Sequence, residues 1–164
     1  MSIFHGGSYK RCLELNSESD NDCHHLISKA ALTQWYQNMK HNRYTKFLSF
    51  KSQSWAPSIV MTHQDHMLTL SYCGDDACDD ELLEAAYKYI DSQAERLIKS
   101  GDIVGVLKEE TSFIEELFGS KYKEAITEMW DYFYTLNPRI EGTVLSFTNP
   151  NIHNFTFHYD FSSQ

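Results

Sequence analysis

The stretch "KSGDIVGVLKEETSFIEELFGSKY", residues 99–122, contains two pairs in which a glycine precedes a helix-capping residue. Glycine readily adopts the left-handed conformation just past a helix end, and Asp or Ser at an N-cap accepts a hydrogen bond from the first turn. Gly101 and Gly119 therefore end helices, and Asp102 and Ser120 begin them. The residues between the pairs form an apolar stripe at helical spacing: Val104, Leu107, Ile114, Leu117 and Phe118. The stretch predicts one complete helix with a helix on either side.

Both flanking segments have the same apolar spacing. The earlier helix starts at Asp79 or Asp80 and runs to Gly101, and the later one ends before Pro138, which cannot continue a helix. The earlier stripe consists of Leu83, Tyr87, Ile90, Ala94 and Leu97. The later stripe consists of Tyr122, Ile126, Met129 and Phe133. Three consecutive helices are predicted over residues 79–137.

The N-terminal part of the chain predicts a further helix. Residues 1–22 mix glycine, serine and acids and are expected to be loop-rich, with Asp22 as the N-cap of a helix over roughly 23–41. Ile27, Ala31, Trp35 and Met39 recur every four residues and share one face of that helix.

Strands are predicted on both sides of the three helices. "RYTKFLSFKSQSW" (43–55), "SIVMT" (58–62) and "HMLTLSYC" (66–73) predict two or three antiparallel strands, with Leu68, Leu70 and Tyr72 on a buried face. "GTVLSFT" (142–148) and "NFTFHYDF" (154–161) predict a C-terminal hairpin with an aromatic face. We therefore expect a single α+β domain over residues 1–164, with a central hairpin or meander and a C-terminal hairpin.

Composition and charge reduce the range of functions that the protein is expected to have. The chain has 164 residues, 41% of them hydrophobic, which is enough for a sizeable core. Its net charge of −9 is concentrated in Asp75–Asp131, where sixteen acidic residues face six basic ones, a net of −10. Because a basic surface supplies most of the affinity for nucleic acid, direct nucleic-acid binding is disfavoured and a basic protein partner is favoured.

The sequence has no apolar run of signal-peptide or membrane-span length, so we expect a cytoplasmic protein. A domain of this size does not need disulfides to fold. We therefore expect reduced thiols at the four cysteines: Cys12, Cys23, Cys73 and Cys78.

Neither a metal nor a cofactor is predicted. The closest residues of zinc-ligand type are His63, His66, Cys73 and Cys78. On the predicted strand, His66 and Cys73 would be roughly 23 Å apart at ~3.3 Å per residue, whereas zinc ligands lie within about 2.3 Å of the metal. The aspartates around Cys78 oppose a reactive thiolate, and "GDDACDDELLE" (74–84) lacks the order of a calcium-binding loop.

Eight histidines leave enzymatic chemistry open as an alternative. None lies in a local catalytic signature, so no catalytic residue is predicted and the expectation is a protein without enzyme activity. Catalytic groups can nevertheless assemble from distant positions. The alternative to a binding protein is thus an enzyme or metal-dependent domain that uses histidines and cysteines brought together by folding.

The acidic helices are the predicted functional surface. Aromatic residues beside charge are typical of protein–protein hot spots. The residues expected to bind a partner are Asp75, Asp76, Asp79, Asp80, Glu84, Glu109, Glu110, Glu115, Glu116, Glu124, Glu128, Asp131, Trp130, Tyr132 and Tyr134. The expected function is inhibition of a basic toxin or nucleic-acid-acting enzyme, in the manner of an immunity or anti-defence protein. A further alternative is an assembly subunit that pairs through its C-terminal strand.

Overall fold

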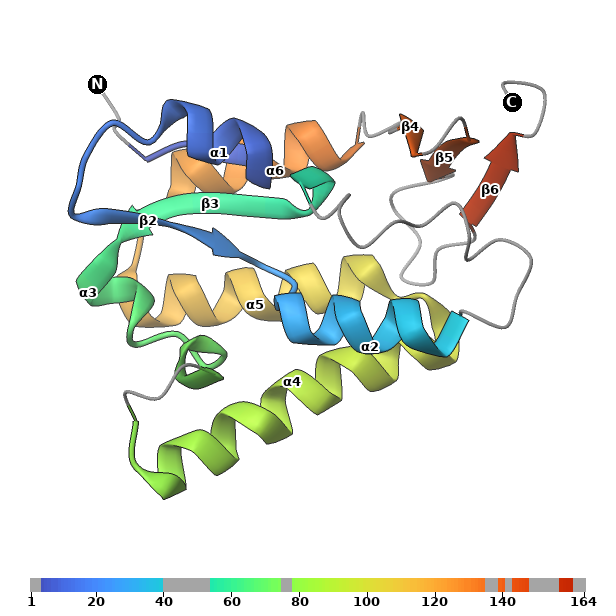
Figure 1. Ribbon diagram of the computed structural model, residues 1–164. Helices are drawn as coiled ribbons and strands as arrows, with labels where there is room; N and C mark the ends of the chain where they lie inside the picture. Colours follow the sequence, from blue (N-terminus) through green and yellow to red (C-terminus); the bar gives the residue numbers. More distant parts are fainter. Residues whose placement is uncertain are drawn as a thin grey trace.

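A computed structural model describes residues 4–39, 54–74, 78–134, 139–140, 143–147 and 157–160. The fold is α+β, as predicted (Figure 1). Its first sheet contains the strands β1 (Gly6–Ser8), β2 (Asn21–His25) and β3 (Pro57–Thr62), in the order β1-β3-β2 with antiparallel pairing. The central strand β3 is the predicted "SIVMT" strand, and its residues from Pro57 to Met61 are buried.

Helices lie on both sides of the strands in the view of Figure 1. The helices α1 (Tyr9–Leu15) and α6 (Lys123–Tyr134) lie above the strands, and α2 (Lys29–Met39), α4 (Asp80–Ser100) and α5 (Ile103–Phe118) lie below them. One apolar cluster joins the layers. It includes Leu26 and Ile27 before α2, Ile59 and Met61 of β3, Leu97 of α4, Leu107 of α5 and Met129 of α6.

The helices α4 and α5 have the predicted boundaries, whereas α6 begins at Lys123 and not directly after the predicted cap Ser120. The side chain of Asp79 accepts a hydrogen bond from the Leu82 amide, and that of Asp102 accepts one from the Gly105 amide. Gly101 and Gly119, with φ of 63° and 62°, follow the last residues of α4 and α5. These caps supply partners for backbone groups that a helix leaves without one at its ends.

The N-terminal region has more regular structure than its sequence predicts. Residues 1–22 include β1, α1 and the start of β2, with a loop between α1 and β2. The helix predicted over 23–41 begins only at Lys29, and Asp22 lies in β2, so its predicted role as a helix cap is wrong. Residues 21–25 pair with β3, and this long-range pairing overrides the local helical spacing.

The strand predicted over 66–73 is also wrong. The chain after β3 forms the short helix α3 (His63–His66), then turns, then the 3-10 helix η3 (Tyr72–Gly74). Leu68 and Leu70, expected on a buried face, are exposed. The distance argument against a zinc site rested on that strand and fails with it.

The other predicted strands are only partly described. Most of 43–55 lies outside the described residues, and Ser54 and Trp55 form part of a 3-10 turn. The C-terminal hairpin is confirmed, because β5 (Thr143–Phe147) pairs antiparallel with β6 (Phe157–Asp160), and β4 (Arg139–Ile140) pairs with β5. The aromatic face predicted there lies outside the described side chains, so assembly through this hairpin stays a prediction.

Two cysteines are joined. Cys73, in η3, forms a disulfide with Cys78, which lies just before α4. The expectation of reduced thiols is therefore wrong for this pair, whereas Cys12 and Cys23 are free. Within the described ranges, no helix is both long enough and apolar enough to cross a bilayer.

Candidate functional site: a histidine-lined pocket

Strand β2 and helix α3 bring four histidines to one end of the sheet. Cys23, His24 and His25 follow one another on β2, and His63 and His66 lie at the two ends of α3. The side chain of Thr62 caps α3 by accepting a hydrogen bond from the Asp65 amide, 3.1 Å away. Because Thr62 is paired with Asn21 in the sheet, α3 starts directly beside the beginning of β2.

One carboxylate holds both histidines of α3. Asp22 Oδ2 lies 2.7 Å from His63 Nδ1 and 2.8 Å from His66 Nδ1. Burial alone would raise the pKa of Asp22, but hydrogen bonds from His66 and His63 outweigh it and lower the pKa below its ordinary value. An ionised carboxylate only accepts, so both Nδ1 atoms donate. The Nε2 atom of His66 is then the basic atom of that ring.

A second carboxylate holds His24. Glu110 Oε1 of α5 lies 2.9 Å from His24 Nε2, and the side chains are only 2% and 3% exposed, respectively. The Tyr89 hydroxyl of α4 donates to the other oxygen of Glu110. Burial, followed by the charge of Glu110, raises the pKa of Tyr89 and keeps its proton in place. This network fixes the orientation of His24, whose ring centroid lies 4.9 Å from that of His66.

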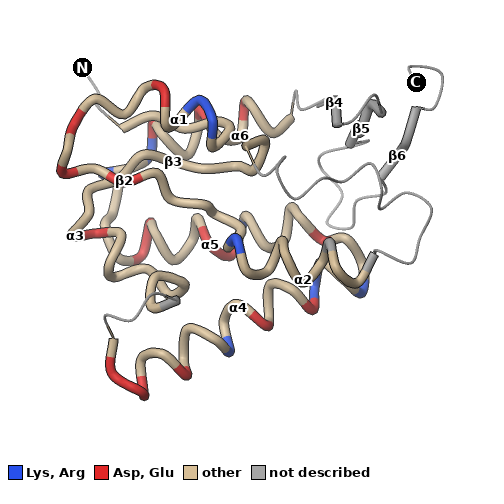
Figure 2. The backbone as a smooth tube through the Cα atoms, in the orientation of Figure 1, with Lys and Arg blue, Asp and Glu red and all other residues tan. Residues whose placement is uncertain are grey.

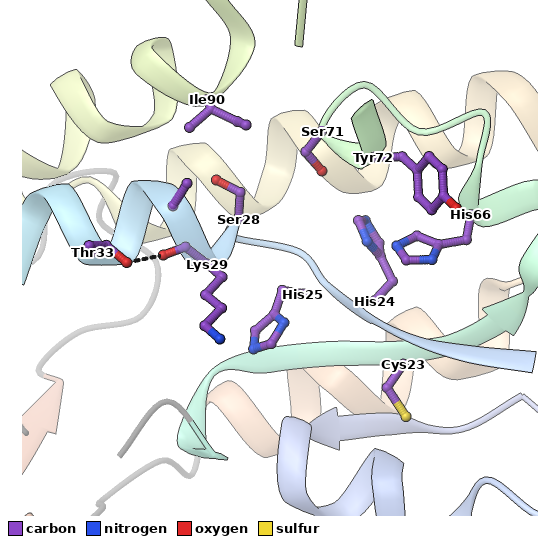
Figure 3. Close-up of a pocket in the computed structure, with 11 residues that line it drawn as sticks. Cys23, His24, His25, Ser28, Lys29, Thr33, His66, Ser71, Tyr72 and Ile90 are labelled. Atoms are coloured by element: carbon purple, nitrogen blue, oxygen red, sulfur yellow. Dashed lines mark hydrogen bonds between the residues drawn. The ribbon is translucent and has the colours of Figure 1, made fainter. Parts of the chain in front are cut away.

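His24, His25 and His66 line a pocket of about 430 Å³ (Figure 3). Its walls come from β2, the first turns of α2, the end of α3, residues 71–72 and Ile90 of α4. The ionisable groups of the wall are the imidazoles of His24, His25 and His66, the ammonium of Lys29, the thiol of Cys23 and the phenol of Tyr72. The lining residues include no aspartate or glutamate.

His25 is the least satisfied of these groups. Its ring stacks on Tyr9 with centroids 4.0 Å apart, and its Nε2 is buried with no hydrogen-bond partner among the described residues. Burial, followed by the nearby His24 and Lys29, lowers the pKa of His25 to about 4. The pKa of His66 is also lowered, by burial and by His24, against the opposing effect of Asp22. At neutral pH both imidazoles are thus mainly uncharged.

Cys23 is a weak candidate for nucleophilic chemistry. Burial, followed by the charge of Asp22, raises the pKa of its thiol to about 11, so the reactive thiolate is scarce at neutral pH. In the part of the chain that the structure describes, no three side chains of His, Cys, Asp or Glu converge in a way that could hold a metal ion. The pocket is therefore equipped for hydrogen bonding and proton transfer by imidazoles.

The predicted partner-binding residues occupy several environments. On α4, Asp79 caps the helix, Asp80 is exposed, and exposed Glu84 lies 3.7 Å from Lys88. Asp75 and Asp76 lie outside the described residues. On α5, Glu115 and Glu116 are exposed, and Glu109 pairs with Arg96.

Glu110 contradicts its predicted role. It is 1% exposed and binds His24 and Tyr89, so it is unable to contact a partner protein. We expected it to face outward together with the other acids of α5. The buried face of α5 instead includes Glu110 together with Leu107, Thr111 and Ile114.

The residues of α6 are divided between the surface and the core. Glu124 and Asp131 are exposed, and Glu128 Oε2 lies 3.8 Å from His5 Nδ1. Trp130 and Tyr132 are partly buried against the core, and the Tyr132 hydroxyl donates to the Trp55 carbonyl oxygen 2.7 Å away. Exposed Tyr134 stacks on Trp130 with ring centroids 5.5 Å apart.

The acidic positions do not gather in one place. Figure 2 shows them distributed along α4, α5 and α6. Helix α6 packs against β1 and β3, whereas α4 packs against α2 and α5. The predicted binding surface is therefore separated into at least two parts of the molecule.

Comparison of the chain with protein-family models, with curated proteins and with solved structures finds no match. One sequence signal for the pocket was available. The spacing of His63 and His66 places two imidazoles on one side of a helical turn, and Asp22, His24 and His25 lie close together in the chain.

Proposed function

We propose that the protein binds a small molecule in the histidine-lined pocket, with His66 as the group that accepts a proton from it. This proposal develops the alternative in which folding assembles distant histidines. The observation that carries it is the hydrogen bond between Asp22 Oδ2 and His66 Nδ1, which fixes the ring of this pocket residue and leaves Nε2 as its basic atom. A positioned imidazole of this kind is the commonest general base in proteins.

Several features of the site support a binding role. A pocket of about 430 Å³ is within the size range of small-molecule sites. Ionisable groups with shifted pKa values beside a cavity are typical of functional sites. The buried His24–Glu110 pair holds one wall of the pocket in place at the expense of desolvating two ionisable groups.

The test compares two histidines that share one partner. His66 lines the pocket and His63 does not, although both donate to Asp22. We expect metabolites that raise the melting temperature of the wild-type protein to lose this effect with His66→Gln and to keep it with His63→Gln. Equal loss in both variants, or no stabilising metabolite in a broad library, would contradict the proposal.

A second candidate function is the binding and inhibition of a basic protein, such as a toxin or a nucleic-acid-acting enzyme. The observation that favours it is the start of α4, where Asp79, Asp80 and Glu81 are exposed. Among the described residues, no ion pair joins these three to a lysine or arginine. Acidic surfaces of this kind steer association with basic partners.

Affinity capture from the native host tests this second candidate. We expect a basic protein to be retained at low salt and released at raised salt, because screening weakens exposed charge contacts. Combined Asp80→Asn and Glu81→Gln substitutions should weaken its retention, and Glu124→Gln with Asp131→Asn on α6 serve as the matched control. Retention that is the same in both variants would count against a surface centred on α4.

A cytoplasmic location belongs to the same inhibitor proposal. Disulfides persist mainly in oxidising compartments, so the Cys73–Cys78 bond bears directly on this point. The number of thiols that an alkylating reagent modifies in the denatured protein, taken directly from its host, distinguishes a reducing from an oxidising compartment. Four reactive thiols favour the cytoplasm, and two favour an oxidising compartment.

A further inference from the structure

The charge of the pocket wall is opposite to the charge of the molecule. The chain carries a net charge of −9, yet the lining includes the ammonium of Lys29 and no acidic side chain, and its three histidines add hydrogen-bonding groups. We propose that the ligand carries a phosphate group, which binds at the N-terminus of α2 between Lys29 and His25. This inference rests on the proposed function, since it names the class of molecule that the same pocket takes.

The first turn of α2 supplies donors for such a group. The first N–H groups of a helix have no acceptor within it and carry partial positive charge, which makes them suitable for oxyanions. Ser28 Oγ accepts from the Ala31 amide at 3.1 Å, and the Ser28 amide donates to Gln93 Oε1 at 2.9 Å. The amides of Lys29 and Ala30, two residues of the pocket lining, have no acceptor in the described part of the chain and are left for a ligand.

His25 provides an independent indication of a ligand. Its Nε2 is buried and has no partner within the described residues, and such an atom costs free energy unless something completes its hydrogen bond. Figure 3 shows the His25 ring beside the end of the Lys29 side chain, below the start of α2 in this view. An oxygen of a ligand held at this helix end would supply the missing partner.

The number and arrangement of donors favour phosphate over carboxylate. The start of α2 offers backbone amides, the Lys29 ammonium and the His25 ring lie on the same side of β2, and Ser71 and Tyr72 line another part of the pocket (Figure 3). A phosphate monoester presents three oxygens in different directions and carries up to two negative charges. A carboxylate has two oxygens in one plane and would leave more of these donors without a partner.

Isothermal titration calorimetry with a matched series tests the inference. The probes are phenyl phosphate, benzoate and benzyl alcohol. They share a phenyl ring and carry a phosphate, a carboxylate and a neutral hydroxyl group, respectively. We expect phenyl phosphate to bind best. Lys29→Gln should weaken it by about tenfold, because a charge-assisted hydrogen bond is lost. Lys108→Gln, an exposed site on α5, should leave binding unchanged.

The failures of the two proposals are distinguishable. Equal or better binding of benzoate overturns the preference for phosphate. Binding of benzyl alcohol alone overturns the inference that the ligand is an anion. In both cases the proposed function stands. If phosphate binds and His66→Gln has no effect on it, the role of His66 fails and the anion site stands. If neither these probes nor any metabolite of the library binds, both proposals fail. Because Lys29 is exposed, its substitution tests the site without loss of the fold.

Discussion

Glu110 shows how one buried residue determines the geometry of the pocket. Its two carboxylate oxygens bind His24 and Tyr89, which come from β2 and α4. Glu110 therefore links three elements of the molecule. The sequence identifies α5 and its boundaries, and helical spacing places Glu110 on the side of Leu107 and Ile114, but the charge of Glu110 favours an outward assignment. A buried partner such as His24, 86 residues away in the chain, is not visible in local spacing.

We expect Glu110→Ala to lower the free energy of unfolding by about 3 kcal/mol, because it leaves the His24 ring and the Tyr89 hydroxyl buried without a shared acceptor. Glu110→Gln, which keeps the shape and one acceptor oxygen, should cost less than Glu110→Ala. Urea denaturation measures both. Glu116→Ala, at an exposed site on the same helix, is the control and should change stability by less than about 0.5 kcal/mol. A loss for Glu110→Ala as small as the control's would show that the network contributes little.

His25 should make the fold sensitive to acid. The pKa of His25 is about 4 in the folded protein, against an ordinary value of 6.5, so between these pH values the unfolded chain binds a proton that the folded protein does not. Stability therefore falls as the pH drops from 6.5 to 4, by about 3 kcal/mol in total from this residue. The charged and titratable groups around it are His24, Lys29 and His66, with Tyr9 stacked on the ring.

His25→Phe, which keeps an aromatic ring against Tyr9, should remove most of this acid sensitivity. Urea denaturation at several pH values between 4 and 7 measures the slope of stability against pH for both proteins. His5→Gln, at a half-buried site, serves as the control. Parallel slopes for wild type and His25→Phe would mean that His25 is readily protonated in the folded state.

At the scale of elements, helices were more predictable than the parts that build the site. The caps Asp79 and Asp102 and the glycines after α4 and α5 are local signals, and each helix boundary that depends on them is correct. β2 was misread as helix because its pairing with β3 joins residues far apart in the chain. The alternation of Leu68 and Leu70 predicted a strand after α3. This segment instead forms turns, in which both leucines are exposed. The site lies where these long-range contacts decide the structure.

The contact between β1 and α6 depends on one glycine. A Cβ atom added at Gly6 would lie 1.9 Å from the Ala125 carbonyl oxygen and 2.9 Å from the Met129 amide, both in the backbone of α6. We expect Gly6→Ala to separate the two elements and to cost about 3 kcal/mol of stability or more. Gly119→Ala is the control, since its Cβ would meet nothing within 4 Å and only the backbone conformation, with φ 62° and ψ −132°, opposes it, at about 2 kcal/mol. Similar urea midpoints for the two variants would show that α6 moves away at little cost.

At the scale of the whole molecule, the excess of acids should make stability depend on salt. Between Asp75 and Asp131 sixteen acidic residues face six basic ones, and self-repulsion of such a charge destabilises the compact state. Added salt at 0.1 M largely screens the repulsion between exposed charges that are more than about 10 Å apart. At pH 7.5 we therefore expect the melting temperature to rise by about 3 °C as sodium chloride is raised, which corresponds to about 1 kcal/mol for a chain of this size.

The same reasoning predicts that this salt effect shrinks in mild acid. The sequence has an isoelectric point of about 5.3, so near pH 5.5 little net charge is left to screen. The penalty for keeping His25 neutral, in contrast, grows as the pH falls, and it belongs to a buried ring that salt screens poorly. Calorimetric melting temperatures with and without added salt at the two pH values separate these effects. Equal salt increments at both would show that chloride acts by binding the protein, with the histidine-lined pocket as the first place to look, and would remove charge repulsion as the cause.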